Sequence, residues 1–239
     1  MKALLYKDLI QLFASPLAWI LLAIEQFVLA WIFLLQLDQF QAVQTRIGLN
    51  PNQAVIQPLY LNAALILLFI VPLLGMLGFS LERRNGALDL LLSSPASPTA
   101  LVFGRFIALL AWLLPAILLC LVMATSLALG AAIDLPRLFA GAFALLLCAA
   151  LYAALTIWLS TLGDQPLATA AAAIGAILLL WLIGDSRAAG GVFSWLGIEA
   201  HFTRLAAGDL NAGDLGYFLA LGCGALLAAT FQLQRSRET

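Results

Sequence analysis

Six long apolar runs, separated by polar or proline-marked segments, make up most of the chain. They cover about residues 16–37, 58–80, 98–130, 136–162, 166–184 and 215–233. A membrane-spanning helix needs roughly 20 predominantly apolar residues. The pattern therefore predicts an all-α integral membrane protein with six spans, in which residues 1–239 form a single transmembrane domain.

A shorter amphipathic segment precedes the first run. In residues 3–14 the polar side chains of Lys7, Asp8 and Gln11 fall on one side of a helix, and apolar side chains such as Leu9 fall on the other. This pattern predicts that residues 1–15 form a helix lying in the membrane interface. No cleavage-site pattern follows, so we expect the first span to be retained.

Four polar residues stand one or two positions ahead of predicted spans: Ser97, Asp134, Asp164 and Asp214. A side-chain oxygen at such a position accepts a hydrogen bond from the unpaired N–H groups of the first helical turn. We therefore expect these four residues to be helix N-caps.

The composition agrees with a membrane protein. Hydrophobic residues make up 64% of the chain and charged residues only 10%, whereas a soluble domain has about a quarter charged residues. The formal net charge of −1 gives no basis for nucleic-acid binding.

The distribution of basic residues predicts the orientation, because cytoplasmic flanks retain Lys and Arg. With both termini inside, the cytoplasmic set is the larger: Lys2, Lys7, Arg83, Arg84, Arg105, Arg235 and Arg237. The outer set is Arg46, Arg137, Arg187 and Arg204. We therefore expect a multi-pass protein of the bacterial inner membrane with both termini in the cytoplasm. The outer connection 185–213 has apolar residues at helical spacing, so we expect it to be re-entrant or amphipathic.

Several chemistries lack the residues that they need. The single histidine, His201, excludes a two-histidine metal site such as HExxH, and no lysine follows Lys7 to complete a phosphate-binding loop. No G-x-S-x-G nucleophile elbow is present. We therefore expect no catalytic, cofactor-binding or metal-binding residues, and a chain that does not hydrolyse ATP by itself.

The connection between the second and third spans is the most informative segment. Residues 81–95 concentrate charge in a chain that has little, and their leucines fall on one side of a short helix. Such a helix can lie along the inner membrane surface and present its polar side to a soluble partner. An ordinary loop that only fixes topology by its positive charge explains the composition equally well.

The same residues carry a family resemblance. The run Leu81-Glu-Arg-Arg-Asn-Gly-Ala-Leu-Asp-Leu-Leu-Leu-Ser-Ser-Pro95, with Gly104-Arg105 in the next span, resembles the E-x-[KR]-x-G-T-L-E-x-L-L-x-x-P…GK pattern of ABC type-2 exporter permeases. Ala87 and Asp89 replace the threonine and glutamate of that pattern. The stretch 198–218, with His201-Phe202 and Asp214, is similar to the gliding-motility and nitrous-oxide-reductase-maturation branch of that family.

The resemblance implies the ABC type-2 exporter fold and a permease without catalytic activity. It implies that residues 81–95 are the coupling helix that receives the motion of a cytoplasmic ATPase, which binds ATP and Mg. It also implies a second permease copy, in a homodimer, within membrane lipid, and it leaves room for an additional membrane or periplasmic subunit. The coupling residues would be Glu82, Arg83, Arg84, Gly86, Asp89 and Pro95.

Two sets of residues within the spans are candidates for the translocation path or the dimer seam. Glu25 is the only formally charged residue deep in an apolar run, beside Gln26, and the alternative is that it lies near enough to the interface to be solvated. Ala168, Ala172 and Ala176 recur every four residues, a small-residue face that lets helices pack closely between or within subunits.

His201, Phe202 and Arg204 are candidates for an outer gate, although a lone histidine in such a loop is more often simply solvated or hydrogen-bonded. In the second span, Pro72 with Gly75 and Gly78 predicts a kink. Two other functions stay open: a secondary transporter, which would need paired intramembrane charges and an inverted repeat, and a membrane scaffold that does not transport.

Overall fold

The computed structural model describes residues 2–47, 51–76, 78–86, 97–130, 133–185 and 195–238. These residues form helices, and no strand occurs among them. The α-helices are α1 (Lys2–Phe13), α2 (Pro16–Ile47), α3 (Gln57–Gly75), α4 (Phe79–Arg84), α6 (Pro98–Ser126), α7 (Leu135–Ser160), α8 (Pro166–Asp185), α10 (Ile198–Ala206) and α11 (Ala212–Glu238); a π-helical turn, η1 (Asn52–Ile56), precedes α3, and a 3-10 turn, η2 (Leu127–Leu129), follows α6.

The six predicted spans are confirmed by length and composition. The helical stretches apolar enough to cross a membrane are Pro16–Ala42, Asn52–Arg84, Pro98–Leu129, Leu135–Ser160, Pro166–Gly184 and Ala212–Arg237. Two boundaries differ from the sequence prediction. The helix of the first span, α2, continues to Ile47, well beyond its apolar run, and the second span begins with η1 and is divided into α3, which ends at Gly75, and α4, which begins at Phe79.

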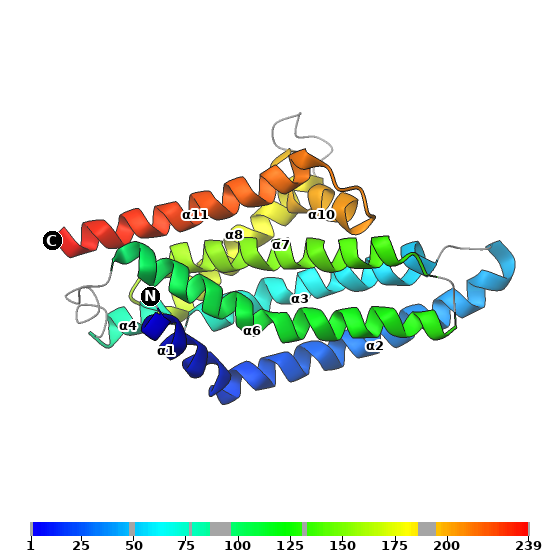
Figure 1. The fold of residues 1–239 in the computed structure, drawn as a ribbon, viewed down its shortest axis with the longest axis horizontal. Coiled ribbons are helices and arrows are strands. Elements are labelled where there is room, and N and C mark those ends of the chain that lie inside the picture. Colours follow the sequence, from blue (N-terminus) through cyan, green and yellow to red (C-terminus); the bar gives the residue numbers. More distant parts are fainter. Residues whose placement is uncertain are drawn as a thin grey trace.

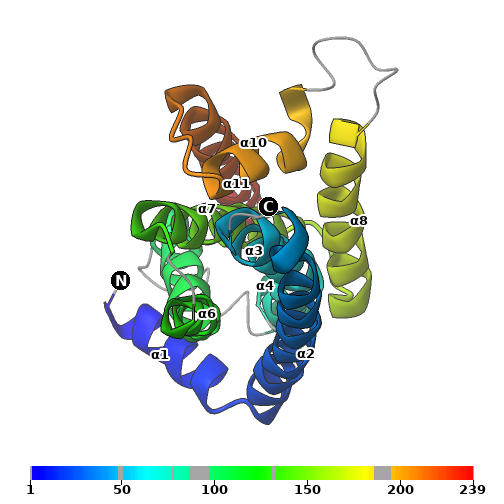
Figure 2. The ribbon, with the colours of Figure 1, turned by 90° about the vertical axis from the view of Figure 1, so that its right-hand side faces the viewer.

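The long helices run side by side along the molecule, and the two ends of the bundle differ (Figure 1). One end carries α1, α4 and the end of α11, and so both chain termini; we call it the terminal end. The other, the far end, carries α10 together with the starts of α3 and α7. Viewed along the bundle, α3 and α7 lie in the middle, with α2 and α8 at the periphery (Figure 2).

Close packing of α3 on α7 depends on small residues at the contact. A Cβ atom added to Gly141 of α7 would overlap the ring of Tyr60, and one added to Gly75 of α3 would overlap Thr156. Tyr60 is fully buried and donates its hydroxyl to the carbonyl oxygen of Leu138 at 3.1 Å. Helices in a membrane approach each other where side chains are small, so these contacts hold the centre of the bundle together.

The break in the second span follows Pro72, as the sequence predicted for a kink. Proline has no N–H to donate inside the helix, and α3 ends three residues later at Gly75. After the break α4 begins at Phe79, and the Ser80 hydroxyl donates to the Met76 carbonyl oxygen at 3.0 Å. The second span is thus made of two helices: α3 ends at Gly75, and Gly78 directly precedes α4.

The predicted helix caps are correct in one case and wrong in two others. Ser97 accepts a hydrogen bond from the Ala100 N–H at 3.3 Å. Asp134 stands at the N-cap position of α7 without making a cap, because its carboxylate pairs with Arg137 at 3.1 Å. Asp214 lies inside the first turn of α11, and its carboxylate is used elsewhere.

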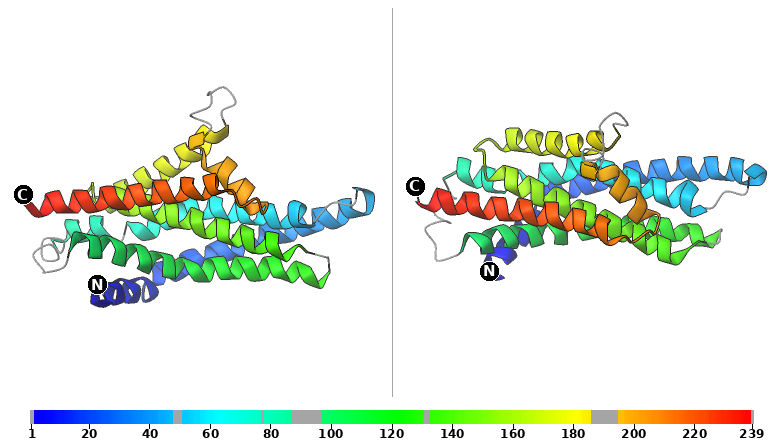
Figure 3. Two further views of the ribbon diagram at one scale, coloured as in Figure 1. Left: turned by 45° about the horizontal axis from the view of Figure 1, so that its top comes forward. Right: turned by 90° about the horizontal axis from the view of Figure 1, so that it is seen from above.

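Helix α1 packs along α6 at the terminal end (Figure 3). Its side chains are not arranged as the amphipathic pattern indicated. Asp8 is buried against the bundle together with Leu12, while Tyr6, Ile10 and Phe13 are exposed. Asp8 therefore faces other helices, because Arg105 of α6 lies there, while the exposed side of α1 carries large apolar side chains together with Lys7 and Gln11.

Candidate functional site

Four charged side chains from three helices meet at the terminal end. Glu82 of α4 accepts from Lys7 of α1 and from Arg105 of α6, each at 2.9 Å through its Oε1 atom. The same Arg105 Nη2 atom lies 3.4 Å from Asp8 Oδ1. We call Lys7, Asp8, Glu82 and Arg105 the four-charge cluster. It joins α1, α4 and α6, which are far apart in the sequence.

The local structure at the break positions Arg105. Its guanidinium lies over the ring of Phe79 at 4.2 Å, an attractive contact between a cation and an aromatic face. Gly78 makes room for it, since a Cβ atom there would lie 3.1 Å from Arg105 Cδ and 3.4 Å from its Nη1. The residues that interrupt the second span are therefore the ones that seat the arginine.

The cluster is largely withdrawn from solvent. The side chains of Asp8, Glu82 and Arg105 are only about one-tenth solvent-exposed, whereas the side chain of Lys7 is about half exposed. Burial raises the pKa of Asp8, and the Arg105 guanidinium opposes this shift. Removing one partner of a buried ion pair leaves an uncompensated charge, so the three buried members depend on one another.

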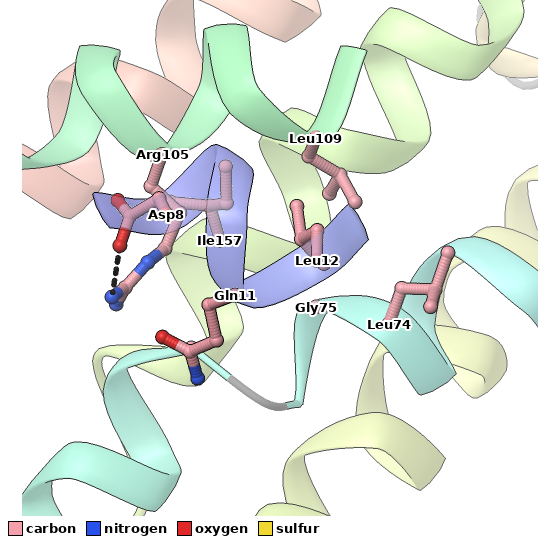
Figure 4. A pocket seen from close by; sticks show the side chains of 9 residues that line it. Asp8, Gln11, Leu12, Leu74, Gly75, Arg105, Leu109 and Ile157 are labelled. Atoms are coloured by element: carbon pink, nitrogen blue, oxygen red, sulfur yellow. Dashed lines mark hydrogen bonds and ion pairs between the residues drawn. The ribbon is translucent and has the colours of Figure 1, made fainter. Parts of the chain in front are cut away.

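A cavity lies between the four-charge cluster and the break (Figure 4). Its apolar wall comes from four helices: Leu12 of α1, Leu74 of α3, Leu109 of α6 and Ile157 of α7. Arg105 Nη1 and Glu82 Oε2 are buried and make no hydrogen bond with described residues. Ordered water commonly occupies such positions. The break in the second span is thus not tightly packed on this side.

The opposite side of α4 makes a second set of polar contacts. Arg83 lies 3.6 Å from Asp164, in the turn between α7 and α8, and donates to the Ser236 hydroxyl of α11 at 3.3 Å. The Thr169 hydroxyl of α8 donates to Ser80 at 3.2 Å. Through Ser80, Glu82 and Arg83, the short helix α4 is therefore connected by polar contacts to α1, α6, α8, α11 and the α7–α8 turn.

The predicted coupling residues have different positions. Glu82 is buried, which contradicts the expectation that the charges of this segment face the cytosol, because its carboxylate serves the four-charge cluster. Arg84 is exposed, as is Gly86, which has a φ of +70° and open space around it. Asp89 and Pro95 lie outside the described residues, as does the segment 87–96.

Glu25 and Gln26 of α2 face the interior of the same chain. Glu25 is 1% exposed, its Oε2 atom has no hydrogen-bond partner among described residues, and Gln26 donates to the carbonyl oxygen of Ala116 in α6 at 3.3 Å. The alternative that Glu25 is solvated near the interface is therefore wrong for this conformation. Its role in a path or a seam stays a prediction.

The small-residue face of α8 points away from the single chain. Ala168 and Ala172 are exposed and Ala176 is half-buried. Beside them lies a groove that also involves Asp164 and Thr169. Helix α2 likewise exposes large apolar side chains, among them Phe27 and Trp31. These surfaces are available for lipid or for a second copy.

The outer-gate candidates meet around Asp214 at the far end. The Asp214 carboxylate accepts from Arg204 through the Nε and Nη2 atoms and contacts His201 Nδ1. His201 Nε2 lies 2.8 Å from the Trp195 carbonyl oxygen, and its ring stacks on Tyr217 with centroids 4.1 Å apart. His201 is buried and hydrogen-bonded at both ring nitrogens, so it is not solvated, and the alternative of a histidine that is simply hydrogen-bonded agrees with the structure. Its role in a gate stays a prediction.

Phe202 fixes the other side of α10. It is fully buried and lies 6.3 Å from the ring of Trp181 in α8, whose indole donates to the Tyr152 hydroxyl of α7 at 2.6 Å. The three candidates thus hold α10 over the far end of α7, α8 and α11. Sequence reasoning placed Asp214 at a helix cap and missed its role as the common partner.

Comparison with known proteins agrees with this architecture. No curated protein matches the chain. Residues 36–184, more than half of the chain, match the family described as ABC-2 family transporter protein. That match covers α4 and the helices α3, α6 and α7, with nearly all of α8, and it leaves out α1, α10 and α11. The protein therefore belongs to the ABC-2 family of transporters, as a multi-pass membrane permease.

Proposed function

We propose that this permease is the membrane subunit of an ABC exporter, and that a separate cytoplasmic ATPase drives it through α4 and the segment that follows. The observation that carries this proposal is the set of polar contacts from α4 to five other parts of the terminal end. ATP and Mg would be bound by the ATPase, and this chain would supply no catalytic group. The resemblance of residues 198–218 supports placing the permease in the gliding-motility and nitrous-oxide-reductase-maturation branch of that family.

The terminal end would face the cytoplasm of a bacterial inner membrane. Six basic side chains belong to this end: Lys7, Arg83, Arg84, Arg105, Arg235 and Arg237. Positive charge is retained on the cytoplasmic side of membrane proteins. The exposed apolar residues Tyr6, Ile10 and Phe13 of α1 are suited to the inner membrane surface.

Motion would pass from the ATPase to the spans in two directions. The partner would contact exposed residues at the end of α4, with Arg84 offering a cation to an acidic surface. A displacement of α4 would pull α1 and α6 through Glu82, and the α7–α8 turn and α11 through Arg83. Because α3 ends at Gly75 and α4 begins at Phe79, α4 would be able to move without carrying α3 rigidly with it.

Two copies would pair to enclose the path. The exposed faces of α8 at Ala168 and Ala172 and of α2 are the surfaces with small or apolar residues that such pairing requires. The charges of the four-charge cluster, in contrast, pair with one another within one chain. Cargo would leave at the far end, where α10 covers the bundle.

The experiment that tests coupling uses the permease purified with the ATPase that accompanies it, reconstituted in lipid. Arg83→Glu should lower the permease-dependent ATPase rate, and Arg83→Glu combined with Asp164→Arg should restore it. Leu210→Ala at the exposed far end serves as the control. Full stimulation in Arg83→Glu would contradict the proposed transmission.

The same preparation separates the alternatives. A membrane scaffold would bind the ATPase without changing its rate, and a secondary transporter would transport without ATP. Loss of transport together with loss of stimulation in Arg83→Glu favours the exporter.

A further inference from the structure

A polar pocket at the far end is not used by the proposed coupling. It lies where η1, the start of α7 and the end of α10 come together, and its lining includes Gln53, Gln57, Arg137, Ala206 and Ala207. Amide and guanidinium groups supply its polar side, and two alanine residues supply the wall from α10. The far end otherwise consists mainly of apolar packing and the Asp214 contacts.

Arg137 is held in place on one side by a chain of two polar contacts. Asn52, which is buried, bonds both backbone groups of Asp134: its amide donates to the carbonyl oxygen at 3.1 Å and accepts from the N–H at 3.3 Å. The Asp134 carboxylate then pairs with Arg137 Nε at 3.1 Å. The first turn of α7 and its arginine are thus fixed by a residue of η1.

Gly208 limits Arg137 from the other side. Its φ is +93°, and a Cβ atom there would lie 3.0 Å from Arg137 Cγ. A left-handed backbone at this position favours glycine. The aliphatic part of the arginine therefore lies directly against the turn after α10, with no side chain between them.

The end of the guanidinium is unused. Arg137 approaches Asp134 through Nε, and neither Nη group of Arg137 donates a hydrogen bond to the part of the chain that the structure describes. Gln53 is exposed and likewise makes no such bond, and Gln57 makes only a long one, to the Thr203 carbonyl oxygen at 3.4 Å. Donors are therefore available around this pocket.

The π-helical turn contributes to this arrangement. Residues Asn52–Ile56 form η1, which continues directly into α3 at Gln57, and helical positions four residues apart lie on one face. That face includes Gln53 and Gln57. Such turns are uncommon and occur frequently at functional sites.

We propose that this pocket binds an oxyanion, the carboxylate, sulfate or phosphate group of a small ligand, through the two free amino groups of Arg137. The planar guanidinium fork matches two oxygens of such a group and is stronger than a single neutral hydrogen bond. Gln53 and Gln57 donate to the remaining oxygens. Because Asp134 already offsets part of the arginine charge, a singly charged group fits better than a doubly charged one.

Binding has a structural consequence. The ligand lies against Ala206 and Ala207, so it connects the end of α10 to η1 and α7. Occupancy therefore slows local opening of α10 (Ile198–Ala206). This inference does not depend on the ATPase partner, and it holds for the isolated permease.

The test measures thermal unfolding of the purified permease in nanodiscs of neutral lipid, with acetate, citrate, sulfate or phosphate titrated against chloride at constant ionic strength. Wild type should show a saturable rise in Tm with at least one of these anions. Arg137→Gln should abolish the rise, and Gln53→Ala should raise the half-saturating concentration several-fold. Arg84→Gln, which removes an exposed arginine at the opposite end, is the matched control and should behave as wild type.

Hydrogen exchange gives a second readout with the same anions. Amides of Ile198–Ala206 should exchange several-fold more slowly in the bound wild type and show no change in Arg137→Gln. An equal Tm rise in wild type and Arg137→Gln would show only the general stabilisation by excluded salts, and would overturn the site. If Arg137→Gln does not fold, unchanged affinity in Gln53→Ala and Arg137→Lys would overturn it as well.

Discussion

Glu82 and Arg105 form a 2.9 Å ion pair directly beside the break in the second span, with both side chains about nine-tenths buried. The pair links the short helix α4 to the third span, and Lys7 and Asp8 extend the link to α1. A charged contact at this depth is unusual in a chain with so few charges. It is the feature from which our account of the terminal end begins.

Breaking this pair should destabilise the protein. Glu82→Gln leaves Arg105 buried without its main counter-charge, and such losses cost about 3–5 kcal/mol. Glu82→Gln with Arg105→Met removes both charges and should recover much of the loss. The free energy of unfolding in mild denaturing detergent checks this, with Arg84→Gln as an exposed control. A single variant as stable as wild type would contradict the buried pairing.

The pair between Arg83 and Asp164 should behave differently. Asp164 is largely exposed and the separation is 3.6 Å, so the contact should contribute no more than about 1 kcal/mol to stability. Arg83→Glu should therefore unfold almost as wild type does while lowering permease-dependent ATPase activity. If the free energy of unfolding and the ATPase activity both fell in Arg83→Glu, the contact would have only a structural role.

Close packing of α3 on α7 predicts a difference between glycines. Gly141→Ala would force a methyl group into the Tyr60 ring, and overpacking of this kind costs about 1–3 kcal/mol. Gly175→Ala, on α8, has no atom within 4 Å of the new Cβ and is the matched control. Unfolding free energies of the two variants should differ by at least 1 kcal/mol, and equal values would show that the α3–α7 contact relaxes easily.

The Asp214 contacts predict how firmly α10 is held. Asp214→Asn removes the anion between Arg204 and His201, so amides of Ile198–Ala206 should exchange faster with solvent. Asp209→Asn, in the exposed turn after α10, should leave exchange unchanged. Unchanged hydrogen exchange in Asp214→Asn would mean that Phe202 and its apolar neighbours are sufficient to hold α10 in place.

The six spans could be predicted from the sequence because the apolar runs alone specify them. The direction in which individual side chains point could not. Asp8 was expected to share the polar side of a surface helix, but its partner Arg105 lies 97 positions further along the chain, and no local pattern reveals such a pair. The same holds for Glu82, whose burial depends on helices before and after it.

Helix boundaries also differ in how far the local sequence determines them. Ser97 caps α6 as predicted because capping is a local interaction. Asp134 and Asp214 had the same local signal, but nearby arginines compete for their carboxylates and form stronger, charged hydrogen bonds. The helix of the first span, α2, extends through the polar residues 38–47, beyond the end of the apolar run that hydropathy detects, since backbone hydrogen bonding continues there.

The most direct test of the central claim locates the ATPase on the permease. A photo-reactive amino acid is placed at Arg84 or, as the control, at Leu210 on the exposed turn of the far end, and the complex is irradiated in native membranes. The account predicts a covalent product containing the ATPase from position 84 and none from position 210. A product from position 210, or none from position 84 in an ATPase-containing complex, would contradict it.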